Sequence, residues 1–264
     1  SDVQKFLLGV ATHWIEKYDI DGWRLDVSDE VSHDFWRAFR KSVKAAKPDC
    51  VILGENWHDS APFLRGDQFD GIMNYALTKA CLDYFVNGAF TATDFANKLS
   101  ALYVRNNKTA NGMMLNLLDS HDTHRFYTLA DKNADKLACA LAVVFMHTGA
   151  PCVYYGTEVL TEGGYDPDCR RTMDWDDGRE NIRPLLRALA DLRRSPEIED
   201  GAIAFGTQGE LFILDRIRDG VLRLYVNATD KAVAVRDEGE TLLAHNYRNG
   251  KLGSNGFLVV RRTL

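Results

Sequence analysis

The sequence lacks the features that mark several large classes of protein. No apolar run approaches the roughly 20 residues that a membrane-spanning helix requires, and basic residues form no long cluster. A net charge of -6 argues against a nucleic-acid backbone as partner. Neither a secretory signal nor a low-complexity segment is visible. We therefore expect a globular chain whose partner is neither a membrane nor a nucleic acid.

Cysteine is also scarce, and its pattern excludes two kinds of site. The five cysteines are odd in number, lie far apart and form no C-x-x-C pair. They lie at positions 50, 81, 139, 152 and 169. Most have apolar neighbours and are expected to behave as small hydrophobic residues. This pattern predicts a reducing compartment, the cytoplasm, and no metal cluster.

The chain has ample material for a core, with 264 residues of which 45% are hydrophobic. That length suits one large domain, or one domain and a small module. Apolar runs that predict buried strands lie at 23–27, 51–55, 69–75, 113–118 and 152–156. Helical periodicity covers 3–18, 32–47, 77–85, 93–104, 136–147 and 182–194. Strands that alternate with helices predict βαβ crossovers and a parallel sheet.

The pattern changes after residue 198. Segments 211–217, 221–227 and 257–262 read as strands joined by short turns that contain Gly or Asp. This arrangement predicts a small antiparallel module. We therefore expect two domains, one at 1–197 and one at 198–264.

Acidic residues follow three of the predicted strands. Asp26, Glu55 and Asp122 lie at or just after strand ends, and such ends open on one face of a parallel sheet. Like charges repel, so a purely structural role is a poor reason to gather three acids there. Two carboxyl groups in different environments are what glycosidic bond cleavage requires. For Arg24 and Asp26 alone, a structural ion pair is the favoured alternative.

Aromatic and histidine side chains accompany the predicted strand ends. They are Trp23, Trp57, Tyr75, Tyr155, His58, His121 and His124. Aromatic faces pack well on the CH surfaces of sugars, and histidines can hydrogen-bond to hydroxyl groups. The composition around the acids is therefore typical of a sugar site.

Three motifs resemble, in order and spacing, signature regions of the alpha-amylase family of glycoside hydrolases. They are DGWRLDV at 21–27, GENWH at 54–58 and SHDT at 120–123. The likeness is strongest to the neopullulanase, cyclomaltodextrinase and maltogenic amylase group, and it runs from residue 1 to about 195. It implies the C-terminal part of a TIM (β/α)₈ barrel, about strands 4–8, followed by a small antiparallel β-sandwich.

The resemblance also implies catalytic roles. Asp26 would be the nucleophile, with Arg24 orienting it, and Glu55 would be the general acid/base. Asp122 would grip sugar hydroxyls and stabilise the transition state, with His121 donating beside it. The family retains anomeric configuration, so the carboxyls of Asp26 and Glu55 are expected about 5–5.5 Å apart.

Other positions match residues that contact more distant parts of the substrate. Asp166 and Arg170 match a pair that contacts further glucose units, although a surface salt bridge is an equal alternative. Glu30 matches an acceptor-side position, and Trp57 and His58 lie near the leaving-group side. The substrate implied is an α-glucan: cyclodextrin, pullulan, starch or maltodextrin, cleaved at α-1,4 bonds, with α-1,6 bonds as a further candidate. No cofactor is expected. Family members often bind calcium, but no compact Asp/Asn loop supports it here.

The chain departs from the family pattern at its amino end. We find no counterpart of the first barrel strands, of the signature Asp and Asn-His pair, or of the inserted domain. We therefore expect weak or no turnover from this chain alone. The alternatives to an α-glucan hydrolase are a catalytically silent, carbohydrate-binding half-barrel and a self-associating module. In the last, open sheet edges would pair with a second copy as a homodimer.

Overall fold

The computed structural model describes residues 1–175 and 181–263. The chain forms two compact units, and each is described by itself. Unit 1 comprises residues 1–75 and 104–115, and unit 2 comprises 76–103 and the chain from 116 onward. The predicted division at residue 197 stays a prediction.

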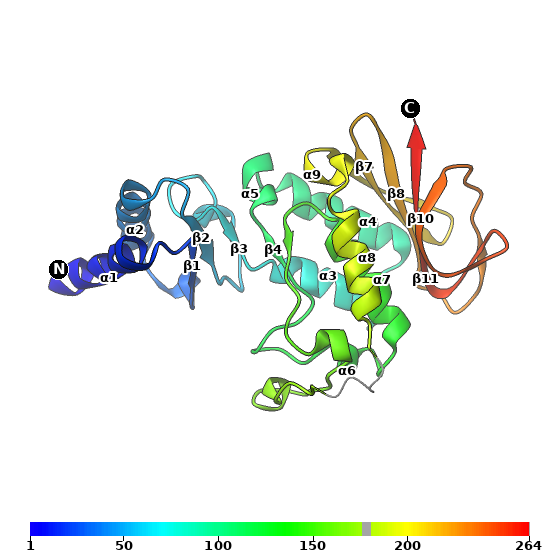
Figure 1. The fold of residues 1–264 in the computed structure, drawn as a ribbon, viewed down its shortest axis with the longest axis horizontal. Coiled ribbons are helices and arrows are strands. Elements are labelled where there is room, and N and C mark those ends of the chain that lie inside the picture. The colour runs from blue at the N-terminus through cyan, green and yellow to red at the C-terminus, as the bar shows by residue number, and fades with distance from the viewer. Residues whose placement is uncertain (176–180, 264) are drawn as a thin grey trace. The chain divides into compact units, whose positions relative to one another are not determined.

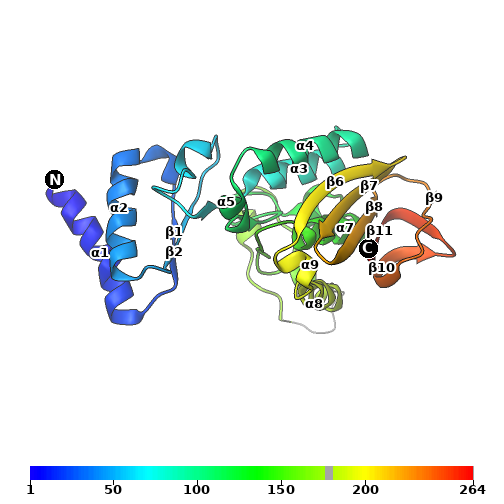
Figure 2. The same ribbon diagram turned by 90° about the horizontal axis from the view of Figure 1, so that it is seen from above.

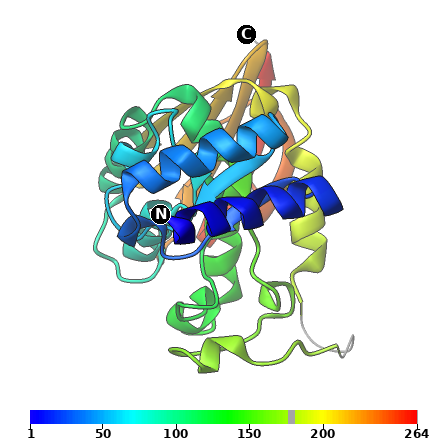
Figure 3. The ribbon, with the colours of Figure 1, turned by 90° about the vertical axis from the view of Figure 1, so that its left-hand side faces the viewer.

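Unit 1 is a small parallel sheet with two helices packed against it. Its elements are α1 (Asp2–Tyr18), β1 (Gly22–Leu25), η1 (Ser28–Glu30), α2 (His33–Ala46), β2 (Val51–Gly54), η2 (Ala61–Phe63), β3 (Gly71–Ile72) and α5 (Lys108–Gly112). The strand order is β1-β2-β3, and both pairings are parallel. α1 and α2 run beside each other (Figure 3). The parallel pairing confirms the prediction for this part of the chain.

The sequence explains the bounds of α2. The Ser32 hydroxyl accepts a hydrogen bond from the Phe35 N–H and so caps the first turn. The buried face then repeats at helical spacing through Trp36, Phe39 and Val43. The helix ends before Pro48, as predicted. These side chains pack with β2, which fixes where the strand end and its following acid lie.

Unit 2 contains most of the helices and a curled antiparallel sheet (Figures 1 and 2). Its helices are α3 (Tyr75–Phe85), α4 (Ala92–Val104), α6 (Phe126–Leu129), α7 (Ala134–Met146), η3 (Thr157–Val159), η4 (Asp168–Arg170), α8 (Arg183–Leu192) and α9 (Pro196–Glu199). Its strands are β4 (Leu115–Asn116), β5 (Ala150–Pro151), β6 (Ala202–Gln208), β7 (Leu211–Ile217), β8 (Gly220–Asn227), β9 (Val233–Ala234), β10 (Glu240–Arg248) and β11 (Lys251–Thr263). α3, α4 and β4 each extend by one residue across the boundary with unit 1.

The sheet of unit 2 follows the order β10-β11-β8-β7-β6, with β9 paired to β11. Side chains alternate along β7: Phe212 and Leu214 join the large core that includes α7, whereas Leu211 and Ile213 join a smaller core on the other face. The antiparallel prediction is confirmed. Side chains of α7 and of the sheet therefore belong to one core.

Several sequence predictions are wrong in detail. The strand predicted at 152–156 is absent: β5 lies at Ala150–Pro151, and Gly156 takes a φ of 83° in the turn that leads to η3. Most of 69–75 is not strand either, since only β3 is extended and Tyr75 begins α3. β6 and β10 were not predicted.

Arg193, which directly follows α8, ties the end of α7 to a later part of unit 2. Arg193 donates to the carbonyls of Phe145, His147 and Gly149 at 2.6–3.1 Å. These carbonyls lie at or just past the helix end, where they lack helical partners. A cation at that end also complements the helix dipole.

Two further findings concern the classes of protein considered above. No helix within 1–175 and 181–263 is both long and apolar enough to cross a membrane. All five cysteines are free, and Cys152 is the one that is only half-buried.

The buried His147 is expected to make unit 2 sensitive to acid. Burial lowers the pKa of His147 from 6.5 to about 4, so the unfolded chain takes up a proton first as the pH falls. Stability is then lost between pH 6.5 and 4, by up to roughly 3 kcal/mol. His147→Gln should remove this part of the loss in urea titrations at pH 7 and 4.5. His13→Gln, at an exposed position on α1, should keep the full loss of stability. If the free energy of unfolding of His147→Gln falls between pH 7 and 4.5 as much as that of the unmodified chain, the prediction is contradicted.

Candidate active site

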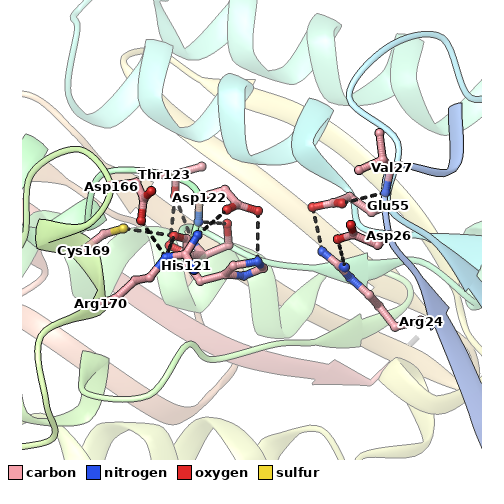
Figure 4. A network of polar contacts seen from close by, with 11 residues as sticks. Arg24, Asp26, Val27, Glu55, His121, Asp122, Thr123, Asp166, Cys169 and Arg170 are labelled. Atoms are coloured by element: carbon pink, nitrogen blue, oxygen red, sulfur yellow. Dashed lines mark hydrogen bonds and ion pairs between the residues drawn. The ribbon is translucent and has the colours of Figure 1, made fainter. Parts of the chain in front are cut away.

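The first cluster of charged side chains lies in unit 1, at the ends of β1 and β2. Arg24 points outward near the end of β1, while Asp26 and Glu55 follow their strands directly. Nη1 of Arg24 lies 2.6 Å from Oδ1 of Asp26, and Nη2 lies 2.6 Å from Oε1 of Glu55 (Figure 4). One guanidinium therefore bridges both carboxylates.

Glu55 is held much more firmly than Asp26. Its side chain is 3% exposed, whereas that of Asp26 is 73% exposed. The Val27 N–H donates to Oε2 of Glu55 at 3.0 Å, and the Ser28 hydroxyl donates to the Glu55 carbonyl oxygen at 2.6 Å. Gly54 allows this approach, because a Cβ there would lie 2.7 Å from the Ser28 hydroxyl. The two carboxyls thus have different environments, which is what glycosidic bond cleavage requires.

Trp57 lies on the loop after Glu55 and stacks on Tyr75, with ring centroids 3.7 Å apart and planes at 12°. The Trp57 ring remains 44% exposed. The backbone N–H of Trp57 donates to the Asp29 carboxylate at 3.2 Å, so the loop is tied to η1. Glu30 and His58 have exposed side chains. Trp23, an alternative site residue, packs edge-on against Phe39 in the core of unit 1.

The second cluster lies in unit 2 around Asp122. Nε2 of His121 lies 3.0 Å from Oδ2 of Asp122, and Nη2 of Arg170 lies 2.9 Å from Oδ1. Arg170 also pairs with Asp166 at 2.6 Å and donates to the His121 carbonyl (Figure 4). Arg170 therefore joins two acids that lie 44 positions apart in the sequence. The predicted surface salt bridge is real, but it includes the candidate acid Asp122.

Arg125 holds the loops around this second cluster and was not predicted as a site residue. Its side chain is buried, with Nε donating to the Cys169 carbonyl at 2.9 Å and Nη1 to the Tyr155 carbonyl at 2.5 Å. The guanidinium lies over the Tyr154 ring at 3.9 Å. Nη2 has no hydrogen-bond partner among the described residues. The only available signal was a charged residue just after the SHDT motif.

Asp119 lies beneath the cluster at the start of the same polar segment. Burial raises its pKa to about 6, against the lowering effects of the Phe126 N–H and of Arg125. Its carboxylate accepts the Phe126 N–H at 2.8 Å and so fixes the start of α6. This acid is fully enclosed, and we assign it a structural role.

Removing the Arg125 side chain should loosen the loop at 155–171. Arg125→Met deletes two buried hydrogen bonds to loop carbonyls, each worth about 1 kcal/mol or more, and should speed chymotrypsin cleavage in this loop at least about tenfold. The control is Arg187→Met, at an exposed position on α8. Equal cleavage rates for the two variants would contradict the anchoring role.

No group of three or more His, Cys, Asp and Glu side chains within the described parts of the chain is placed to hold a metal ion. The clusters present are those of paired carboxylates and arginines. Their chemistry is that of acids, bases and hydrogen bonds to hydroxyl groups.

The chain belongs to the alpha-amylase family of glycoside hydrolases. The sequence-family model that describes the alpha-amylase catalytic domain matches residues 1–184. This confirms the resemblance that the three sequence motifs indicated.

Curated relatives with similar sequences include a cyclomaltodextrinase and a maltogenic amylase. A cyclomaltodextrinase from Thermoanaerobacter pseudethanolicus is 44% identical over 218 residues, which are 82% of this chain and 37% of the relative. An intracellular maltogenic amylase from Bacillus subtilis is 47% identical over 195 residues, 73% of this chain and 33% of the relative. The chain thus spans about a third of the length of these curated relatives.

A solved structure matches almost the whole chain. The cyclic alpha-maltosyl-(1→6)-maltose hydrolase from Arthrobacter globiformis is 32% identical, with a TM-score of 0.89. The match covers 99% of this chain and 60% of that one. The fold is therefore that of an alpha-amylase family enzyme.

Proposed function

We propose that this chain carries the catalytic acids of a retaining α-glucan hydrolase. Asp26 is the nucleophile, Glu55 is the general acid/base, and Arg24 orients both. The observation that carries the proposal is the Arg24 guanidinium, which lies 2.6 Å from each carboxylate. A shared guanidinium keeps the two carboxyl groups close, and retaining enzymes need a separation of about 5–5.5 Å.

The reaction proceeds in two displacements. The Asp26 carboxylate attacks the anomeric carbon while the bond to the glycosidic oxygen breaks, and Glu55 gives its proton to that oxygen. Glu55 then takes a proton from water, which attacks the glycosyl–Asp26 ester and releases the sugar and the free carboxylate. Two inversions retain the anomeric configuration. The exposed Asp26 suits attack, and the buried Glu55, held by the Val27 N–H, suits directed proton transfer.

The remaining predicted residues bind the glucan. Asp122 stabilises the oxocarbenium-like transition state and His121 donates beside it. Asp166 and Arg170 contact more distant glucose units. On the leaving-group and acceptor sides we assign Trp57, His58 and Glu30.

The substrates we propose are cyclodextrins, pullulan, starch and maltodextrins, cleaved at α-1,4 and α-1,6 bonds. The names of the relatives, a cyclomaltodextrinase, a maltogenic amylase and a cyclic maltosyl-maltose hydrolase, support this class. The relative named intracellular favours the predicted cytoplasmic location. We further propose that residues 1–197 form barrel strands 4–8 and that 198–264 form the sandwich. Self-association through the edge strand β1 stays a prediction.

The test is hydrolysis of a cyclodextrin and of maltohexaose by this chain, with Asp26→Asn as control. We expect weak turnover that the substitution abolishes, with the α-anomer as the first product seen by proton NMR. The β-anomer as first product would contradict the retaining mechanism. No turnover above the Asp26→Asn control would contradict the proposed function for this chain.

A further inference from the structure

Tyr165 is an exposed aromatic residue that the proposed function does not use. It is 70% exposed and lies between Gly164 and the Asp166 that pairs with Arg170. An aromatic ring in water at this place forfeits the burial that such rings normally gain. Its setting in unit 2, beside the Asp122 cluster, indicates a ligand rather than the protein core.

The backbone around Tyr165 is fixed by hydrogen bonds. The Tyr165 carbonyl accepts the Asp168 N–H at 2.8 Å, and the Asp168 carboxylate accepts the Gly164 N–H at 2.6 Å. Asp168 is itself held by Arg171 at 2.7 Å. The turn that presents the ring is therefore ordered before any ligand arrives, which lowers the entropic cost of binding.

The ring is oriented by a histidine from the Asp122 segment. Tyr165 and His124 meet edge to face, with centroids 5.2 Å apart and planes at 67°. His124 lies two positions after Asp122. The exposed ring therefore lies next to the segment that carries a candidate sugar-binding acid.

The charges beside the ring select a neutral ligand. Arg170 is already paired with both Asp122 and Asp166, so among the described residues this cation beside the ring is not free to bind an anion such as phosphate. The carboxylate oxygens still have lone pairs that can accept hydrogen bonds from hydroxyl groups. An apolar ring next to hydrogen-bond acceptors matches a pyranose, which has apolar CH faces and a rim of hydroxyls.

We propose that Tyr165 is the stacking platform for a glucosyl unit beyond the one that Asp122 contacts, so that this chain prefers longer α-glucans. The inference rests on the proposed function for its substrate class. Tyr165 binds the chain of the glucan and takes no part in the bond cleavage. A surface aromatic without a ligand is the alternative.

Calorimetric titration with maltohexaose and with maltose tests this platform. All variants carry Asp26→Asn, which prevents turnover. Tyr165→Ala should raise the Kd for maltohexaose about tenfold, equivalent to about 1.4 kcal/mol, and leave that for maltose unchanged. Tyr165→Phe keeps the ring and should keep the affinity. The matched control is Phe6→Ala, which removes another ring that is 70% exposed and should have no effect.

Three results would overturn the inference: unchanged maltohexaose affinity in Tyr165→Ala, an equal loss for maltose, or no maltohexaose binding by the chain with Tyr165 intact. Failure of the proposed function looks different. Binding that depends on Tyr165, without hydrolysis by the chain that retains Asp26, would contradict only the catalytic proposal. Hydrolysis that is insensitive to Tyr165→Ala on short and long glucans alike would contradict only the platform.

Discussion

Replacing Glu55 by glutamine is expected to lower kcat for maltodextrin hydrolysis by about 10²–10⁴-fold, the usual contribution of a positioned general acid or base. Glutamine has nearly the same size and can still accept the Val27 N–H. It has no proton to give to the leaving oxygen. The loss of rate therefore reports on proton transfer rather than on the shape of the site.

The substrate provides a second test of the same role. Fluoride leaves without protonation, so formation of the glycosyl–enzyme from α-glucosyl fluoride should suffer much less in Glu55→Gln. Glu16→Gln, at an exposed position on α1, is the matched control and should retain the full rate. A Glu55→Gln rate within about tenfold of the unmodified chain on maltodextrins would contradict the assignment, as would equal losses on both substrates.

Replacing Arg216 by methionine is expected to destabilise unit 2 by about 3 kcal/mol. Arg216 is 2% exposed, and burial lowers its pKa to about 10. It donates to the carbonyls of Glu197, Ile198 and Gly201 and to the Thr148 hydroxyl. Methionine fills similar space but leaves the buried carbonyls of Glu197 and Ile198 and the half-buried carbonyl of Gly201 without this donor.

Thermal and urea unfolding measure the effect of Arg216→Met. The midpoint should fall by roughly 6–12 °C for a domain of this size. The control is Arg218→Met, which removes exposed ion pairs with Asp200 and Asp219 and should cost less than about 1 kcal/mol. Equal losses of stability in the two variants would show that the hydrogen bonds from Arg216 on β7 to α9 and to Thr148 do not stabilise unit 2.

Local sequence signals predicted the elements that depend on local chemistry. α1 and α2 follow from a helical apolar repeat, and Ser32 marks the start of α2. The long apolar run at 136–147 likewise predicted a helix, which is α7. In each case the signal lies within a few residues of the structure that it predicts.

Elements that depend on distant partners were missed or misplaced. β10 has bulges between Thr241 and Leu243 and between His245 and Tyr247, so its side-chain alternation is broken. The residues after β5 are apolar like a strand, but they lead into the turn at Gly156. No local pattern distinguishes a buried turn from a short buried strand.

The candidate site shows the same contrast between residues that local motifs predicted and residues whose placement depends on distant partners. The acids were found because Asp26 and Glu55 follow strands within recognisable motifs. The bridging position of Arg24 between them is a tertiary fact, since it requires β1 and β2 to pair in the observed register. Arg125 was missed because its partners, the carbonyls of Tyr155 and Cys169, leave no trace in the identity of any residue.

The most direct test of the catalytic account is to trap the glycosyl–enzyme and locate the sugar. A fluorinated glucosyl fluoride slows both displacements, yet its good leaving group lets the covalent intermediate accumulate. Peptide mass spectrometry after this treatment should find one glucosyl adduct, on Asp26, and none in Asp26→Asn. An adduct on another residue, or none on a chain that hydrolyses maltohexaose, would contradict Asp26 as the nucleophile.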